Sequence, residues 1–239
     1  MEFRIHSAVS KKFPELFVSL SIVEGFNNRP SAKVANEILG MLRESEEGLR
    51  KRFASKDDLY ADPFVETYFE LFQSFGVNPR RVKPSHVALA ERVVKGGSLP
   101  DINPAVNLYN AFSVKYLVPF GGEDLDKVDD FFEMAFAKGD ESWTGIGETE
   151  PVSPIPGDII WQDKSAVSTI SLNHRQCEKT KLTEDTTRGY FICEGLRGVN
   201  KEHIEEVTKN FLECFITCLG GEGRQFLLTA EEPIAHLAR

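Results

Sequence analysis

The stretch from Asn103 to Glu123 reads NPAVNLYNAFSVKYLVPFGGE and places costly polar side chains inside a segment with helical features. Asn103 is a preferred N-cap residue and Pro104 stands at the first helical position, so a helix is predicted to begin there. Asn103, Asn107 and Asn110 follow helical spacing and share one face near that start. Asn costs roughly 0.5 kcal/mol or more relative to Ala inside a helix. This amide-lined face is therefore either a solvated surface or one wall of a polar pocket.

A second polar stretch, Asn173 to Thr187, reads NHRQCEKTKLTEDTT and directly follows a predicted strand. Loops fixed at strand ends are where binding groups tend to lie. Arg175 and Lys181 can hold a phosphate or a carboxylate, Arg as a planar fork and Lys as a point charge. Thr180 can donate a hydrogen bond, and Glu184 can accept one from an ammonium group or a water. The alternative is a turn network in which these side chains satisfy the loop backbone.

The rest of the chain divides into helices first and strands later. Periodicity and punctuation predict helices over residues 31–54, 63–75 (with Asp62 as cap), 85–95 (with Ser85 as cap) and from Asn200 to Gly220. Strands are predicted over residues 16–23, 157–163, 166–172 and 189–193. Strict βαβ alternation is missing, which favours an α+β layered domain with a helix-rich N-terminal half and a sheet-rich C-terminal half. Within it, residues 1–59 are expected to form a strand-helix layer of the same domain, and residues 220–239 a C-terminal tail.

Composition excludes several classes of protein. The 239 residues, 41% of them hydrophobic and eighteen of them Phe, indicate a folded globular protein. No run approaches the ~18 consecutive apolar residues of a membrane span, and the N-terminus MEFRIHSAVSKKF lacks the pattern of a secretory signal. We therefore expect a soluble, cytoplasmic protein with no membrane partner. A formal net charge of −9 argues against non-specific coating of nucleic acid, although it leaves room for a local basic groove.

Common catalytic and cofactor motifs are missing from the sequence. The chain has no complete phosphate-binding loop, no Gly-x-Ser-x-Gly nucleophile elbow and no helical pair of histidines. Cys214 and Cys218 lie four residues apart, as metal ligands would, but Phe211, Phe215 and Leu219 around them favour buried thiols that act as small hydrophobes. A covalent Ser or Cys mechanism thus has no support, and we expect neither a cofactor nor a metal.

Two segments together resemble a known family. They are KPSHVALAERVVKGGSLPDINPAVNLYNAFSVKYLVPFGGEDLDKV, beginning at Lys83, and GDIIWQDKSAVSTISLNHRQCEKTKLTEDTTRGYF, beginning at Gly157. Both are similar to the tRNA-editing domain of the phenylalanyl-tRNA synthetase β subunit, its paired B-three/B-four modules. The likeness extends from about Tyr60 to Phe215, so residues 60–219 are expected to form an editing-like region with a PheT/TilS-like fold. The synthetase subunit is several times longer, which makes this chain similar to free-standing members of the family and unlike a complete aminoacyl-tRNA ligase.

The resemblance implies a function. The family's domain hydrolyses the ester that joins a wrong amino acid to its tRNA, so its partners are an aminoacylated tRNA 3′ end and the amino acid moiety. Because such an ester is labile, orientation and polarisation of a water can suffice without a covalent nucleophile. We expect an aminoacyl-tRNA deacylase acting in trans. The alternative is a non-catalytic tRNA- or amino-acid-binding module derived from the editing domain.

The helix and its C-terminal end are expected to supply part of the site. On this hypothesis Asn107 and Asn110 lie on the pocket wall and bind ribose or ester oxygens. Lys115 and Tyr116 lie at the rim, towards phosphate and base. Asn110 is one of two residues assigned a catalytic role.

The polar loop is expected to supply the rest. Its substrate-binding residues would be Asn173, Arg175, Thr180 and Lys181. Glu184 is the second catalytic candidate, reading the ammonium group or orienting the water, and Asp163 is another carboxylate for the same task. The competing interpretation makes Asn110 and Glu184 polar groups that only hold the fold. The hypothesis requires the helix and the loop to meet around one water-accessible hollow.

Overall fold

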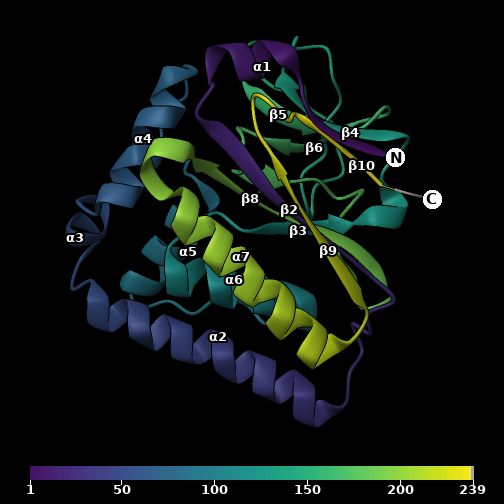
Figure 1. Cartoon of the computed structure of the whole chain (residues 1–239). Coiled ribbons are helices and arrows are strands. Elements are labelled where there is room, and N and C mark those ends of the chain that lie inside the picture. Colours follow the sequence, from purple (N-terminus) through teal and green to yellow (C-terminus); the bar gives the residue numbers. More distant parts are fainter. Residues whose placement is uncertain (238–239) are drawn as a thin grey trace.

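Two β-sheets pack face to face, and a helical layer covers the outer face of the smaller sheet (Figure 1). The computed structural model describes residues 1–237. The smaller sheet has the strand order β3-β8-β2-β9, and the larger has the order β10-β1-β4-β5-β6-β7.

The smaller sheet is built around β2 (Leu16–Glu24), whose antiparallel neighbours are β8 (Arg188–Leu196) and β9 (Glu222–Leu228). Strand β3 (Gly121–Asp124) pairs with the other side of β8. Both faces of β2 are buried, because alternate residues point to opposite faces of a strand. Val18 and Leu20 join the core between the sheets, whereas Phe17 joins the core under the helices.

The larger sheet unites distant parts of the chain. Strand β1 (Glu2–Ile5) lies between β4 (Phe131–Phe136), to which it is parallel, and β10 (Ile234–His236), to which it is antiparallel. β5 (Ile159–Gln162), β6 (Val167–Ile170) and the short β7 (Arg175–Gln176) continue the sheet by antiparallel pairing. The core between the sheets is aromatic: the ring of Phe132 stacks on Trp161 at 5.0 Å and lies 4.7 Å from Tyr190.

The helices form the remaining layers. They are α1 (Ser7–Lys12), α2 (Ala32–Arg52), α3 (Lys56–Tyr60), α4 (Pro63–Ser74), α5 (Ser85–Val94), α6 (Pro104–Tyr116) and α7 (Arg197–Leu219), with a 3-10 turn at Leu125–Lys127. Helices α6 and α7 pack on the smaller sheet, and α2 packs against α6 from the outside (Figure 1). None of the helices among residues 1–237 combines the length and apolar content that a bilayer span requires.

The expected α+β class is confirmed, with a few local differences. Ser85 does not cap α5: Pro84 holds that position, and the Ser85 hydroxyl is buried without a partner. Helix α7 begins at Arg197, earlier than expected, and Asn200 forms a kink with φ −141° and ψ 20° inside it. Strands β1, β3, β4, β7, β9 and β10 were not predicted from the sequence.

The proposed division of the chain at residues 59 and 219 remains a prediction. The first segment supplies β1 to the larger sheet and β2 to the smaller one. The last segment supplies β9 beside β2 and β10 beside β1, while residues 238 and 239 lie outside the described residues. Strand β1 near the N-terminus and strand β10 near the end of the described residues are therefore neighbours in the larger sheet.

Replacing Phe211 with Ala should destabilise the fold strongly. Its side chain is 0% exposed, and its ring lies 4.5 Å from that of Phe120 and 5.2 Å from that of Phe191. Losing a buried Phe typically costs about 3–5 kcal/mol, because a cavity remains. Urea unfolding should show a loss of this size, and the control Lys209→Ala, at an exposed position of the same helix, should change the unfolding free energy by less than about 0.5 kcal/mol. A Phe211→Ala variant as stable as the wild type would contradict this packing.

Candidate functional site

A cavity of about 280 Å³ lies where α6 faces the loop that follows β6. Helices α5 and α6 and both sheets contribute to its walls, which include the apolar side chains of Val106, Phe120 and Ile192. The polar side chains that line it include those of Asn110, Asn173, His174, Gln176 and Glu194, together with Ser85, Tyr109 and Thr169. The amide-bearing helix and the polar loop therefore do meet around one hollow, as the sequence analysis required.

Asn110 presents a free amide to this cavity. Asn110 is 7% exposed. Its side chain forms no hydrogen bond with any of the described residues. Its amide atoms are not fully buried, so they reach the solvent-accessible space of the cavity. Its donors and acceptor remain available to a ligand or a water in the cavity.

Glu194 brings a buried carboxyl group to the same cavity. Its Oε1 accepts a hydrogen bond from Trp161 Nε1 at 3.0 Å, and its Oε2 accepts one from Asn173 Nδ2 at 3.4 Å. No Lys or Arg among the described residues pairs with it, and burial raises its pKa to about 7. This carboxyl group is consequently partly protonated near neutral pH.

Asn173 links three elements at the cavity wall. Its Oδ1 accepts a hydrogen bond from the backbone N–H of Ser85 at 3.2 Å, at the start of α5. Its Nδ2 donates to Glu194 on β8. Both ends of the amide are thus used, so Asn173 positions Glu194 and the start of α5 relative to the loop.

His174 is held in a defined orientation. Its Nδ1 lies 2.7 Å from the backbone carbonyl oxygen of Lys83. Since a carbonyl only accepts hydrogen bonds, Nδ1 carries the proton and Nε2 has a lone pair. Burial lowers the pKa of His174, and the charges of Arg175 and Lys83 lower it further, so the ring is neutral at pH 7.

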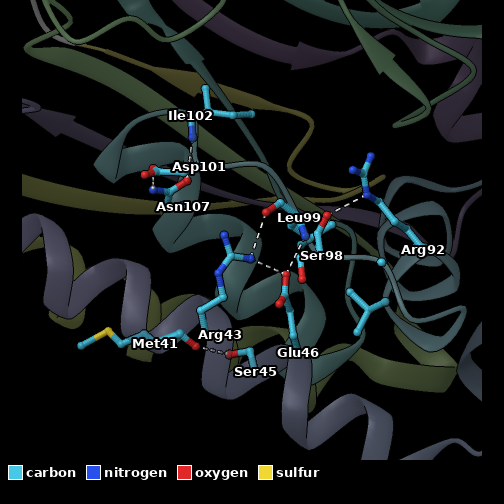
Figure 2. A network of polar contacts seen from close by, with 12 residues as sticks. Met41, Arg43, Ser45, Glu46, Arg92, Ser98, Leu99, Asp101, Ile102 and Asn107 are labelled. Carbon is cyan, nitrogen blue, oxygen red and sulfur yellow. Dashed lines mark hydrogen bonds and ion pairs between the residues drawn. The ribbon is translucent and has the colours of Figure 1, made fainter.

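Asn107 shapes the entry to α6 and does not line this cavity. Its Nδ2 donates to Asp101 Oδ1 at 2.7 Å, and its Oδ1 accepts from the backbone N–H of Ile102 at 3.1 Å. Figure 2 shows these contacts beside the buried carboxylate of Glu46, which accepts the backbone N–H of Leu99 at 2.6 Å. Together they fasten the segment before α6 to α2, and Ile102 of that segment lines the cavity.

Lys115 and Tyr116 lie elsewhere. Lys115 lines a separate cavity of about 390 Å³ between α2, α6 and α7. The ring of Tyr116 packs 5.6 Å from Phe112 and 6.2 Å from His203. Neither residue lines the cavity that contains Asn110, so the structure separates them from the site that they were expected to rim.

Thr180 belongs to a buried hydroxyl cluster around Glu123. Its Oγ1 donates to Glu123 Oε2 at 2.5 Å, as does Ser168 Oγ at 2.5 Å. Thr169 Oγ1 donates to Oε1 at 3.1 Å, and the hydroxyl of Tyr190 also reaches Oε2. Four hydroxyl groups thus satisfy one carboxylate inside the protein, and Thr180 does not line the cavity.

The two cations of the loop are paired within the chain. Arg175 Nη2 lies 2.8 Å from Glu148 Oε1, and its guanidinium lies 5.1 Å from the ring of Trp143. Lys181 forms an ion pair with Glu178. Any anionic ligand must compete with these carboxylates.

Asp163 organises the β5–β6 turn. Its Oδ1 accepts the backbone N–H groups of Ser165 and Ala166, each at 2.9 Å. Its Oδ2 accepts the N–H of Asp129 at 2.9 Å and pairs with Lys179, and these bonds lower its pKa despite its burial. Its role is that of a turn-holding carboxylate.

Glu184 lies on the surface. Its side chain is 62% exposed and its Oε2 lies 3.5 Å from Arg29 Nε. It is not among the residues that line the cavity. Of the residues selected from the sequence, only Asn110 and Asn173 come together there.

His174, Gln176 and Glu194 are among the cavity residues that the sequence analysis missed. His174 and Gln176 lie inside the quoted polar loop, but their spacing carried no separate signal. Glu194 did have one: it follows the apolar run Tyr190 to Cys193 of a buried strand, where a charged residue is unusual. No group of three or more His, Cys, Asp or Glu suited to a metal ion occurs within residues 1–237.

Comparisons with known proteins give one family and several similar solved structures. The family model described as "B3/4 domain" matches residues 67–211. The N-terminal fragment of the phenylalanyl-tRNA synthetase β subunit from Pyrococcus horikoshii is 12% identical, with a TM-score of 0.47 over 94% of this chain and 53% of that one. The chain therefore spans about half the length of that fragment. No curated protein matches.

Replacing Glu194 with Gln should change how stability depends on pH. The folded-state pKa of about 7 lies above the ordinary Glu pKa of 4.5, so between these pH values the folded protein binds a proton that the unfolded chain releases. The wild type should lose stability as pH rises from about 4.5 to 7, by roughly 3 kcal/mol in total, and no further above pH 7. Urea unfolding at pH 5, 6, 7 and 8 should show this loss in the wild type relative to Glu194→Gln. Parallel pH curves for the two proteins would rule out the raised pKa.

Proposed function

The chain belongs to the B3/4 domain family, and on this premise we propose that it is an aminoacyl-tRNA deacylase acting in trans. The reaction would be hydrolysis of the ester of a mischarged tRNA by a positioned water. The observation that carries the proposal is the single cavity in which the free amide of Asn110 faces the Asn173–Glu194 pair. The sequence resemblance to an editing domain supplies the reaction class.

The size of the cavity suits one amino acid. Its volume of about 280 Å³ is close to the lower end of the roughly 300–1,000 Å³ found for small-ligand pockets. Apolar walls from Val106 and Ile192 can surround an aliphatic or aromatic side chain, while the polar groups remain for the backbone atoms of the ligand.

Asn110 would supply electrostatic stabilisation. In ester hydrolysis negative charge develops on the carbonyl oxygen in the transition state, and a preorganised N–H donor stabilises it. The Asn110 amide has no partner among the described residues, so its N–H groups are available to the ester oxygen. Glu194 has a pKa of about 7. Its carboxyl group can therefore accept a hydrogen bond from the substrate's α-ammonium group when ionised, or donate one to an oxygen when protonated.

The rest of the tRNA would make few strong contacts. Ile102 and Ile146 are half exposed and line the cavity, which leaves an apolar surface beside it. The nearby cations Arg175 and Lys181 are already paired with carboxylates. Tight, phosphate-dominated binding of a whole tRNA body is therefore not expected, and the acidic net charge of −9 agrees with this.

The pairing of Arg175 and Lys181 with carboxylates also favours a second candidate function, which is binding without catalysis. A module that binds an amino acid or a tRNA end without turnover needs the cavity but no activated water. Saturable binding with no loss of amino acid from any charged tRNA would identify this function.

Asn110→Ala should lower deacylation about 10²-fold, the typical effect of losing one oxyanion donor. The assay is release of the amino acid from a panel of mischarged tRNAs, measured against the uncatalysed rate. The melting temperature should barely move, because the Asn110 side chain has no partner within the described residues.

Two further variants sharpen this assay. Asn210→Ala removes an exposed Asn on α7 and should leave the rate unchanged. Glu184→Ala tests the role expected for Glu184 from the sequence, and under the cavity proposal it should be nearly neutral. Loss of activity in Glu184→Ala, with Asn110→Ala unaffected, would move the reaction centre to the surface loop.

A further inference from the structure

We infer that His174 is the general base that takes a proton from the hydrolytic water in this cavity. The inference rests on the proposed deacylase function and assigns its proton acceptor. A general base needs a free lone pair, a fixed orientation and access to the water. His174 meets each of these requirements.

The lone pair is at Nε2. The carbonyl of Lys83 fixes the proton on Nδ1 through the 2.7 Å contact. No hydrogen bond within the described residues engages Nε2, and the residue lines the cavity. A base oriented by a second group on its other nitrogen is a recurrent arrangement for activating a nucleophile.

The surrounding charges keep the ring neutral. Lys83 lies just before α5, and Arg175 is the residue after His174. The positive charges of both disfavour a proton on Nε2. Each cation is itself held by a carboxylate, Lys83 by Glu91 at 3.4 Å and Arg175 by Glu148 at 2.8 Å. Glu194, on β8, is the carboxyl group that shares the cavity with the imidazole.

A strained turn sets the position of His174. Ser171 and Leu172 have φ values of 49° and 62°, two consecutive non-glycine residues in the left-handed region. Asp158 holds this turn, since its Oδ2 accepts the backbone N–H of Ser171 at 3.0 Å and the Ser171 hydroxyl at 2.8 Å. Leu172 is completely buried and anchors the turn in the core. Strain of this kind persists only where the surroundings over-determine it, and it is concentrated at functional sites.

The other candidate bases are less suitable. Both oxygens of Glu194 already accept hydrogen bonds. His86 is completely buried and is not among the cavity residues, and His203 Nε2 contacts the carbonyl of Tyr116. Among the described residues that line the cavity, His174 is the only imidazole.

The reaction step balances without any further reagent. Nε2 takes a proton from water as the water oxygen forms a bond to the ester carbonyl carbon, and the carbonyl oxygen becomes an oxyanion. The oxyanion then re-forms the carbonyl, the bond to the ribose oxygen breaks, and Nε2 returns the proton to that oxygen. The products are the free amino acid and the tRNA with its terminal hydroxyl restored.

The test uses His174→Ala, His174→Gln and the control His236→Ala, which removes an exposed histidine. Deacylation should fall about 10²–10⁴-fold in both His174 variants and stay unchanged in the control. Added imidazole should restore part of the rate in His174→Ala, because it can occupy the vacated space and accept the proton. Affinity for a non-hydrolysable analogue, an amino acid joined by an amide to 3′-amino-3′-deoxyadenosine, should change by less than about threefold.

The outcomes separate the inference from the function. An active wild type with His174 variants within threefold of its rate would overturn the role of His174 and leave the deacylase standing. A wild type that deacylates no charged tRNA would overturn both. If circular dichroism shows that neither variant folds, the wild-type pH profile decides. Because the pKa of His174 is lowered by burial, the rate above background should hold down to pH 6.5 and then fall in step with protonation of His174 followed by NMR, and a rate that does not follow this titration would refute the inference.

Discussion

Strand β8 is buried on both faces, and the cavity depends on that constraint. Phe191 packs under the helices, while Tyr190 and Ile192 pack towards the larger sheet. Because side chains alternate along a strand, Glu194 must share the face of Ile192, inside the protein. The indole of Trp161 and the amide of Asn173 then satisfy its carboxyl group in place of water. Two-sided packing thus creates a buried carboxyl group with a pKa of about 7.

The three asparagines of the α6 region, Asn103, Asn107 and Asn110, have different roles because different residues surround each of them. Asn103 caps the helix by accepting the N–H of Val106 at 3.1 Å, and it also binds Asn28 and the carbonyl of Leu182. Asn107 holds the preceding segment. Only Asn110 is left for the cavity. Asn103 and Asn107 fix the start of α6, and this holds Asn110 in place at the cavity.

Buried carboxylates recur in this acidic protein, and each has a different set of partners. Glu46 is held by backbone and Arg43, Glu123 by hydroxyl groups, and Glu194 by an indole and an amide. Among these three, only Glu194 has no cation beside it and just two donors, and only Glu194 lines the cavity. Surface cations such as Arg175 meanwhile pair with surface acids. The cavity is therefore small and lined by a carboxyl group with no cation beside it, while the cation Arg175 of the adjoining loop is already paired.

The sequence alone determined the elements whose signals are local. The cap at Asn103, the strand over 16–23 and the long helix over 31–54 could be predicted because capping and hydrophobic periodicity involve residues close along the chain. The family and the two segments that meet could also be read from it. Only the tertiary structure decided that His174 and Glu194 join Asn110, that Thr180 serves Glu123, and that Glu184 faces solvent. The physical reason is that a polar side chain's role depends on which partners reach it, and these partners come from distant parts of the sequence, as Arg29 does for Glu184.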